Sequence, residues 1–152
     1  MRPGVRGDLD NLLALERRAF TGDRLARRSF RHLLGVPTAA LLVAEEGVRL
    51  AGYSLVLFKA RSAGARIYSI AVAPEWVGRG VGALLLAAAE TAARGRGYRV
   101  MRLEVDANNA RAIARYRRAG YRAFGRRPGY YENGADALRF QKQLSTAIGS
   151  AP

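Results

Sequence analysis

The chain has 152 residues and a formal net charge of +14 at neutral pH, with 26 lysines and arginines against 12 aspartates and glutamates. It contains no cysteine and a single histidine, which excludes disulfides, thiolate metal sites, a cysteine nucleophile and a histidine-rich metal centre. A hydrophobic content of 49% fits one domain with its own core, and no apolar run approaches the roughly 20 residues of a membrane span.

The N-terminal part of the chain predicts a short strand and two helices. The strand ends near Val5, and an aspartate at position 8 or 10 caps a helix that has one broad apolar face. Residues 21–23 read Thr-Gly-Asp and break this helix. A second helix is expected over residues 25–34, before a glycine and a proline.

Three β-prone runs follow, at residues 39–44, 50–58 and 65–72. A Glu-Glu-Gly turn joins the first two runs, which is a hairpin signal, and a Ser-Ala-Gly turn leads to the third. The third run ends before Pro74, because proline cannot donate to a sheet ladder.

The segment from 70 to 86 then reads as a strand end, a glycine-rich turn and a helix start. Three glycines stand at alternate positions, Gly78, Gly80 and Gly82, and an apolar helical pattern follows them. The first N–H groups of a helix have no intrahelical partner, and the helix dipole favours negative charge there. Glycines let a phosphate approach the backbone closely, and Arg79 can add positive charge. The segment therefore predicts a phosphate or diphosphate site.

Downstream of the glycines, helical and extended patterns alternate. An apolar 3–4 spacing predicts a helix that runs to about Arg94, and strict alternation predicts a strand over 99–106. A short helix is expected over 109–119, and two last strands over 121–124 and 137–144.

This order of elements predicts an α/β (α+β) fold with a mixed, mostly antiparallel sheet of six or seven strands and helices on both faces. Residues 1–144 are expected to form this single domain. Residues 145–152 are small and polar, and we expect them to form a disordered tail.

The positive charge favours polyanionic partners, such as the phosphates of a cofactor, an acidic peptide or the ribosome surface. The basic residues are scattered rather than grouped in blocks, which argues against direct nucleic-acid recognition. Because no apolar signal-peptide core follows Met1, we expect a cytoplasmic location and no membrane partner.

The glycine spacing alone also fits a tight turn, and it lacks both a Walker A ending and the dinucleotide-binding fingerprint. However, the run from Val77 to Gly82 resembles the acetyl-CoA loop of the GCN5-related N-acetyltransferase (GNAT) family, with the pattern Gln/Arg-x-x-Gly-x-Gly/Ala. Val77 stands where glutamine or arginine is usual. The resemblance implies acetyl-CoA as cosubstrate and no metal, with backbone along the strand end and the glycine loop as its binding site. The implied contacts are Ile70, Ala71, Val72, Val77, Gly78, Arg79, Gly80, Val81, Gly82 and Ala83.

Two downstream residues are candidates for proton transfer. Glu104 lies near the C-terminal end of a predicted strand, where open α/β sheets place their ligands. Tyr116 lies twelve positions later, on the next predicted helix. From spacing alone, Glu104 also reads as a solvated carboxylate and Tyr116 as a core aromatic.

The run from 103 to 121 resembles the Leu-Glu-Val…Asn-x-x-Ala-x-x-x-Tyr-x-x-x-Gly-Phe/Tyr block of the RimI-type branch, the bacterial ribosomal-protein alanine N-acetyltransferases. The resemblance implies that Glu104 is the general base, that Tyr116 is the general acid and that Asn109 contacts CoA. Tyr130 and Tyr131 resemble the segment that lines the peptide site beside the glutamate. The Glu-Asp-Ala pattern that follows has alanine at position 135 in place of glutamate.

Direct attack of an amine in a ternary complex is the expected scheme, because no cysteine can form an acetyl-cysteine intermediate. An α-amine, with a pKa near 7.8, is far more often neutral at pH 7 than a lysine, with a pKa near 10.4. This favours the N-terminal α-amine of a protein, with ribosomal proteins as candidate partners. A small-molecule amine (polyamine or antibiotic), a lysine substrate, and a non-catalytic acetyl-CoA-binding or ribosome-associated module remain alternatives, as do a monomer and a homodimer.

Overall fold

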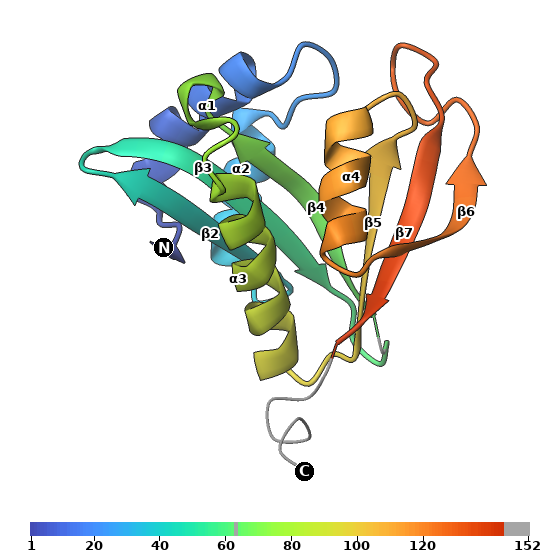
Figure 1. Cartoon of the computed structure of the whole chain (residues 1–152). Helices are drawn as coiled ribbons and strands as arrows, with labels where there is room; N and C mark the ends of the chain where they lie inside the picture. The colour runs from blue at the N-terminus through green and yellow to red at the C-terminus, as the bar shows by residue number, and fades with distance from the viewer. Residues whose placement is uncertain (63, 145–152) are drawn as a thin grey trace.

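The computed structural model describes residues 1–62 and 64–144, so the predicted tail at 145–152 lies outside the described residues. It contains a seven-stranded sheet and four α-helices (Figure 1). The strands are β1 (Arg2–Pro3), β2 (Ala39–Glu46), β3 (Arg49–Phe58), β4 (Gly64–Val72), β5 (Val100–Asp106), β6 (Arg122–Arg127) and β7 (Ala137–Gln143). The helices are α1 (Leu9–Ala19), α2 (Arg27–Gly35), α3 (Val81–Gly95) and α4 (Ala110–Arg118), with 3-10 turns η1 (Arg6–Asp8) and η2 (Pro74–Trp76).

The strands are ordered β1-β2-β3-β4-β5-β7-β6, and every neighbouring pair is antiparallel except β4 and β5, which run parallel. This confirms the predicted mixed, mostly antiparallel sheet. Helices α3 and α4 cover one face of the sheet, and α1 and α2 cover the other (Figure 1). The predicted α/β architecture with helices on both faces is therefore confirmed.

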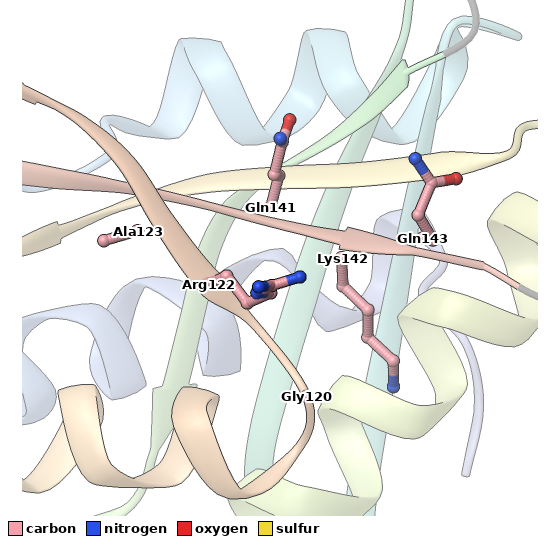
Figure 2. A pocket seen from close by; sticks show the side chains of 6 residues that line it. All are labelled: Gly120, Arg122, Ala123, Gln141, Lys142 and Gln143. Carbon is pink, nitrogen blue, oxygen red and sulfur yellow. The ribbon is translucent and has the colours of Figure 1, made fainter.

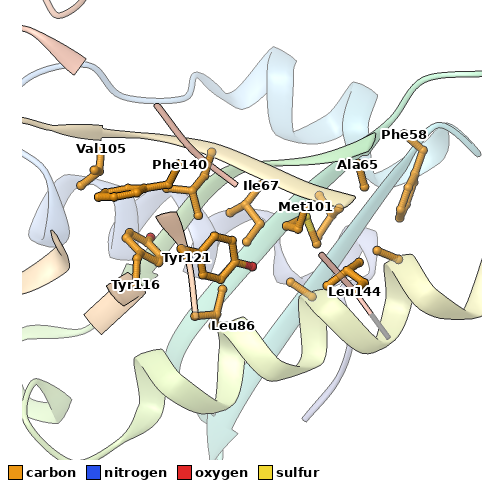
Figure 3. Close-up of a cluster of buried hydrophobic side chains, with 14 residues drawn as sticks. Phe58, Ala65, Ile67, Leu86, Met101, Val105, Tyr116, Tyr121, Phe140 and Leu144 are labelled. Atoms are coloured by element: carbon orange, nitrogen blue, oxygen red, sulfur yellow. The ribbon is translucent and has the colours of Figure 1, made fainter. Parts of the chain in front are cut away.

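Two large apolar cores hold these layers together, and a smaller cluster of Ala51, Val81 and Leu85 lies at the start of α3. One core lies between the sheet and helices α3 and α4, and includes Ile67, Leu103, Tyr116 and Phe140 (Figure 3). The other packs α1 and α2 against β2 and β3, around Tyr53. Burial of apolar area on both faces fixes which side chains of each strand point toward which helix layer.

Asp8 stands at the N-cap position of α1, one of the two predicted positions, but its side chain does not make the expected cap hydrogen bond. The Asp8 carboxylate instead accepts hydrogen bonds from the Val5 amide at 2.7 Å and from the Arg2 guanidinium at 2.9 Å. The nearby guanidinium lowers the pKa of Asp8. A pattern of capping residues cannot reveal this competing partner, because the turn η1 brings Arg2 and Asp8 together.

Glu16 is a buried acid beneath the sheet. Its carboxylate accepts a hydrogen bond from the Tyr53 hydroxyl and another from the Leu25 amide, both at 2.7 Å. Burial raises the pKa of Glu16, because the charged form loses its hydration. The contacts tie α1 both to the segment before α2 and to β3.

Because the pKa of Glu16 is raised in the folded state, the folded protein binds this proton more tightly than the unfolded chain does. The free energy of unfolding therefore falls as pH rises from about 4.3. We expect Glu16→Gln to flatten this pH dependence above about pH 4, measured by urea unfolding at several pH values. The control is Glu46→Gln, at an exposed position. An unchanged slope in Glu16→Gln would contradict the assignment.

Candidate active site

The parallel strands β4 and β5 separate partway along the sheet. Their pairing runs from Gly64 opposite Val100 to Ile67 opposite Leu103 and goes no further. Beyond this point β4 continues to pair with β3, and β5 continues to pair with β7 as far as Asp106. The last part of β4 therefore has one backbone edge that none of the described strands covers, which we call the open edge (residues 68–72). Figure 1 shows the two strands diverging where α4 lies over the sheet.

The glycine loop follows directly after the open edge. Gly78 and Gly80 have φ values of +85° and +83°, in the left-handed region where a side chain would be strained. The first helical acceptor is the Gly80 carbonyl, which binds the Leu84 amide at 3.1 Å. The amides of Val81, Gly82 and Ala83 therefore have no intrahelical acceptor. No side chain caps this end of α3 and its first turn carries no acidic residue, so it suits an anion.

The side chains of the loop add little charge to this anion site. Val77 is apolar and 41% exposed, so it offers no donor. The Arg79 guanidinium lies over the Trp76 ring, 5.1 Å from its centroid. The cation expected from Arg79 is thus engaged with an aromatic ring.

Glu104 is enclosed by two arginines and is not the solvated strand carboxylate that spacing alone allowed. Its side chain is only 6% exposed. Arg66 of β4 donates from Nε to Glu104 Oε1 at 2.8 Å, and its Nη2 lies 2.6 Å from the same oxygen. Arg139 of β7 places Nε 3.5 Å from Glu104 Oε2. Glu104 therefore sits as a paired carboxylate where β4 and β5 begin to separate.

Tyr130 and Tyr131 lie close to Glu104, and Arg66 links Tyr130 to it. The Arg66 Nη2 group donates to the Tyr130 hydroxyl at 2.8 Å, so one guanidinium joins Tyr130 to Glu104. The two tyrosine rings pack edge to face with centroids 4.9 Å apart. Burial raises the pKa of the Tyr131 phenol. The structure thus brings together Glu104 and the tyrosine pair, which lie some 26 residues apart in sequence.

Tyr116 belongs to the other face of the sheet. It is 8% exposed and packs edge to face against Tyr121, with centroids 5.8 Å apart, in the core below α4 (Figure 3). Burial raises the pKa of its phenol, so the group keeps its proton at neutral pH. Glu104 alternates with the core residues Leu103 and Val105, and so points to the opposite face. Because β4 and β5 separate beyond Ile67 and Leu103, no continuous sheet divides the face of Glu104 from the face of Tyr116 at this place.

Asn109 caps helix α4, since its Oδ1 accepts a hydrogen bond from the Ala112 amide at 3.1 Å. This use of the oxygen leaves the side-chain NH₂ group for other acceptors. The predicted contact between Asn109 and CoA stays a prediction.

Two depressions occur on the surface of the described residues, and the smaller, of about 230 Å³, is lined by Arg79 together with Glu46, Arg49, Glu75 and Trp76. The larger, of about 560 Å³, lies at the ends of β6 and β7, and none of the predicted residues lines it (Figure 2). Its lining residues are Gly120, Arg122, Ala123, Gln141, Lys142 and Gln143.

Within residues 1–62 and 64–144, no helix is both long and apolar enough to cross a membrane. Over the same ranges, no cluster of three or more potential metal ligands occurs.

Sequence reasoning did not single out Arg66 or Arg139, although both contact Glu104. Arg66 stands between the buried residues Ala65 and Ile67, which face α3 and α4. Its side chain therefore points to the opposite face of the sheet. A charged residue inside an apolar strand is the signal that could have marked it. Its partner could not be found without the parallel register of β4 and β5.

Comparison with known proteins agrees with this geometry. The sequence model of the Acetyltransferase (GNAT) family matches residues 8–121. The chain is 33% identical over 132 residues to a "Putative [ribosomal protein bS18]-alanine N-acetyltransferase" of Bacillus subtilis (strain 168), covering 86% of each chain. It is 33% identical over 142 residues to "N-alpha-acetyltransferase RimI" of Mycobacterium tuberculosis (strain H37Rv), covering 91% of this chain and 88% of the relative.

The crystal structure of the ribosomal-protein-S18-alanine N-acetyltransferase from Escherichia coli superposes with a TM-score of 0.84 and 25% identity, covering 95% of this chain and 93% of that one. The chain belongs to the GNAT family of acetyltransferases, as the resemblance of its glycine loop and its second motif implied.

The ion pair between Arg66 and Glu104 gives a stability prediction. We expect Arg66→Met to lower the free energy of unfolding by about 1–3 kcal/mol, because a buried carboxylate loses its nearest cation. The matched control is Arg102→Met, at the position that pairs with Arg66 in the sheet register. Urea unfolding measures both.

The double variant Arg66→Met/Glu104→Gln separates the ion pair from other effects of the substitution. The two changes should be non-additive, because removal of the charge on Glu104 also removes the need for its cation. Strictly additive losses would show that Arg66 stabilises the fold without pairing with Glu104.

Proposed function

We propose that this chain transfers the acetyl group of acetyl-CoA to the N-terminal α-amine of a protein. The acceptor that we propose is a ribosomal protein, because two similar proteins are named as ribosomal-protein S18-alanine N-acetyltransferases. The observation that carries the proposal is the separation of β4 and β5, with Glu104 on one face, Tyr116 on the other and the glycine loop at its end. Such a reaction belongs in the cytoplasm, where ribosomal proteins are made.

The residues around the open edge fit acetyl-CoA, which supplies an activated acetyl thioester. The unpaired amides of Val81, Gly82 and Ala83 suit its diphosphate, and the left-handed glycines Gly78 and Gly80 keep side chains away from it. The open edge of β4 offers backbone N–H and C=O groups to the two amides of the pantetheine arm, as an added strand would. These contacts would direct the thioester toward the place where β4 and β5 separate.

In this arrangement Glu104 and Tyr116 divide the proton transfers. The amine nitrogen attacks the acetyl carbonyl, and Glu104 accepts the proton that the nitrogen loses, directly or through a water molecule. As the carbon–sulfur bond breaks, Tyr116 gives its proton to the departing sulfur. A phenol has a pKa near 10 and is protonated at neutral pH, which is the state that a general acid needs; burial raises the pKa of Tyr116 further.

The arginines beside Glu104 also bear on the choice of amine. Arg66 and Arg139 place positive charge next to the carboxylate, and positive charge favours a neutral amine over an ammonium group. An α-amine near pKa 7.8 loses its proton at much lower cost than a lysine near 10.4. Tyr130, held by Arg66, would line the path of the acceptor peptide together with Tyr131.

We expect Glu104→Gln and Tyr116→Phe each to reduce turnover by about 100-fold or more, since each removes a group that transfers a proton. The measurement is release of free thiol from acetyl-CoA with peptides that carry a free N-terminus. Glu45→Gln and Tyr98→Phe are matched controls, because neither residue is among the predicted site residues: the Glu45 carboxylate pairs with Arg2, and the Tyr98 hydroxyl donates to the Lys59 carbonyl. Wild-type rates in both site variants would overturn the assigned roles.

A panel of acceptors separates this function from its alternatives. Peptides with a free α-amine should be acetylated faster than the same peptides with a blocked N-terminus and one lysine, and faster than polyamines. Preference for lysine or for a small amine would replace the proposed acceptor. CoA binding without thiol release from any amine would indicate a binding module.

A further inference from the structure

Helix α4 reaches across to the glycine loop through Arg115. A β-carbon placed on Gly82 would lie 2.7 Å from Arg115 Cζ, 2.9 Å from Nε and 3.0 Å from Nη1. The guanidinium thus occupies the space that any other residue at position 82 would fill. Arg111, one turn earlier on the same helix, has Nη2 3.6 Å from the corresponding point on Gly78. Two arginines of α4 therefore lie against the loop.

This arrangement concentrates positive charge without a counterion. The start of α3 carries the positive end of the helix dipole and three unpaired amides, and it has no acidic residue in its first turn. In the described part of the chain, no carboxylate lies within 4.0 Å of Arg111 or Arg115. Like charges that converge in this way repel one another, and a bound anion would relieve the repulsion.

The loop itself does not provide the cation that a diphosphate attracts. Val77 is apolar, and the Arg79 guanidinium is engaged with the Trp76 ring. Arg115 is half-buried on α4, and its guanidinium is the one that contacts the first turn of α3. A planar guanidinium can donate two parallel hydrogen bonds to phosphate oxygens.

We propose that Arg115 binds the diphosphate of acetyl-CoA from helix α4, in place of the side chain that Val77 lacks, and that Gly82 is glycine so that Arg115 can reach it. Arg111 lies beside the same loop and adds to the positive field. This inference rests on the proposed use of acetyl-CoA. It assigns the cation to helix α4 rather than to the loop.

The test is calorimetric titration of the whole protein with CoA, which needs no turnover. Arg115→Ala should weaken binding by about 10- to 100-fold, as expected for loss of charge-assisted hydrogen bonds. Arg115→Lys should recover part of the affinity, since it keeps the charge without the planar fork. Arg118→Ala is the matched control, because Arg118 is an exposed arginine of the same helix. Unchanged affinity in Arg115→Ala would overturn the inference.

Dephospho-CoA, which lacks the 3′-phosphate, identifies the group that Arg115 contacts. If Arg115 binds the diphosphate, Arg115→Ala weakens dephospho-CoA by the same factor as CoA. If the penalty disappears with dephospho-CoA, Arg115 binds the 3′-phosphate and the proposal is wrong. If the wild-type protein binds neither compound, it is the proposed function that fails.

The role of Gly82 has its own test. Gly82→Ala introduces a methyl group that displaces the flexible guanidinium, so it should weaken CoA binding about as much as Arg115→Ala. In the Arg115→Ala background the same substitution should have little further effect. Additive losses would show that position 82 must be glycine for the ligand itself, and would contradict the assigned reason for this glycine.

Discussion

The site depends on one structural constraint: β4 and β5 pair as parallel strands over four residue pairs and then separate. Each strand is paired along its other side, β4 with β3 and β5 with β7. The pairing of β3 with β4 also shifts register between Leu55 and Val56, close to where the separation begins. Backbone groups along the open edge are left without a strand partner, and unpaired backbone groups are costly when they are buried. A ligand with amide groups of its own can satisfy them.

The same separation bears on the proposal that Glu104 and Tyr116, which lie on opposite faces of the sheet, take part in one reaction. Alternation along β5 directs Leu103 and Val105 into the core under α4 and directs Glu104 to the other face. In a closed sheet, Glu104 and Tyr116 would be divided by a continuous layer of backbone. The loss of pairing after Ile67 removes this layer at the place where Arg66, Arg139 and Tyr130 gather around the carboxylate.

The positive charge of the chain is used in several local ways. Arg66 and Arg139 pair with Glu104, Arg102 and Arg139 lie over the Phe124 ring, and Arg115 contacts the glycine loop. Arg66, Arg102 and Arg139 lie on the sheet face opposite α4, where their positive charge favours neutral amines and acidic groups near Glu104. The net charge of +14 is thus partly a property of the site and its surroundings, as well as of the surface.

Much of the fold could be predicted from local sequence patterns, because alternation, 3–4 spacing and glycine-rich turns report on neighbouring residues. The glycine loop was predicted from its glycine spacing, whereas the roles of Glu104 and Tyr116 came from the resemblance to a known family and stay predictions. The partners of Glu104 could not be predicted, since Arg66 and Arg139 lie 38 and 35 residues away and meet it only through strand register. The contact of Arg115 with Gly82 likewise depends on how α4 packs beside α3, and the role of Asp8 depends on Arg2.

Amide hydrogen exchange, measured by NMR with and without CoA, tests the central claim most directly. The amides of Val81, Gly82 and Ala83, and those of residues 68–72 that face away from β3, should exchange rapidly in the free protein. Bound CoA should protect these amides from exchange, because it supplies hydrogen-bond acceptors for N–H groups that have no partner in the free protein. If CoA binds and these amides exchange as before, the cosubstrate lies elsewhere and the account of the open edge is wrong.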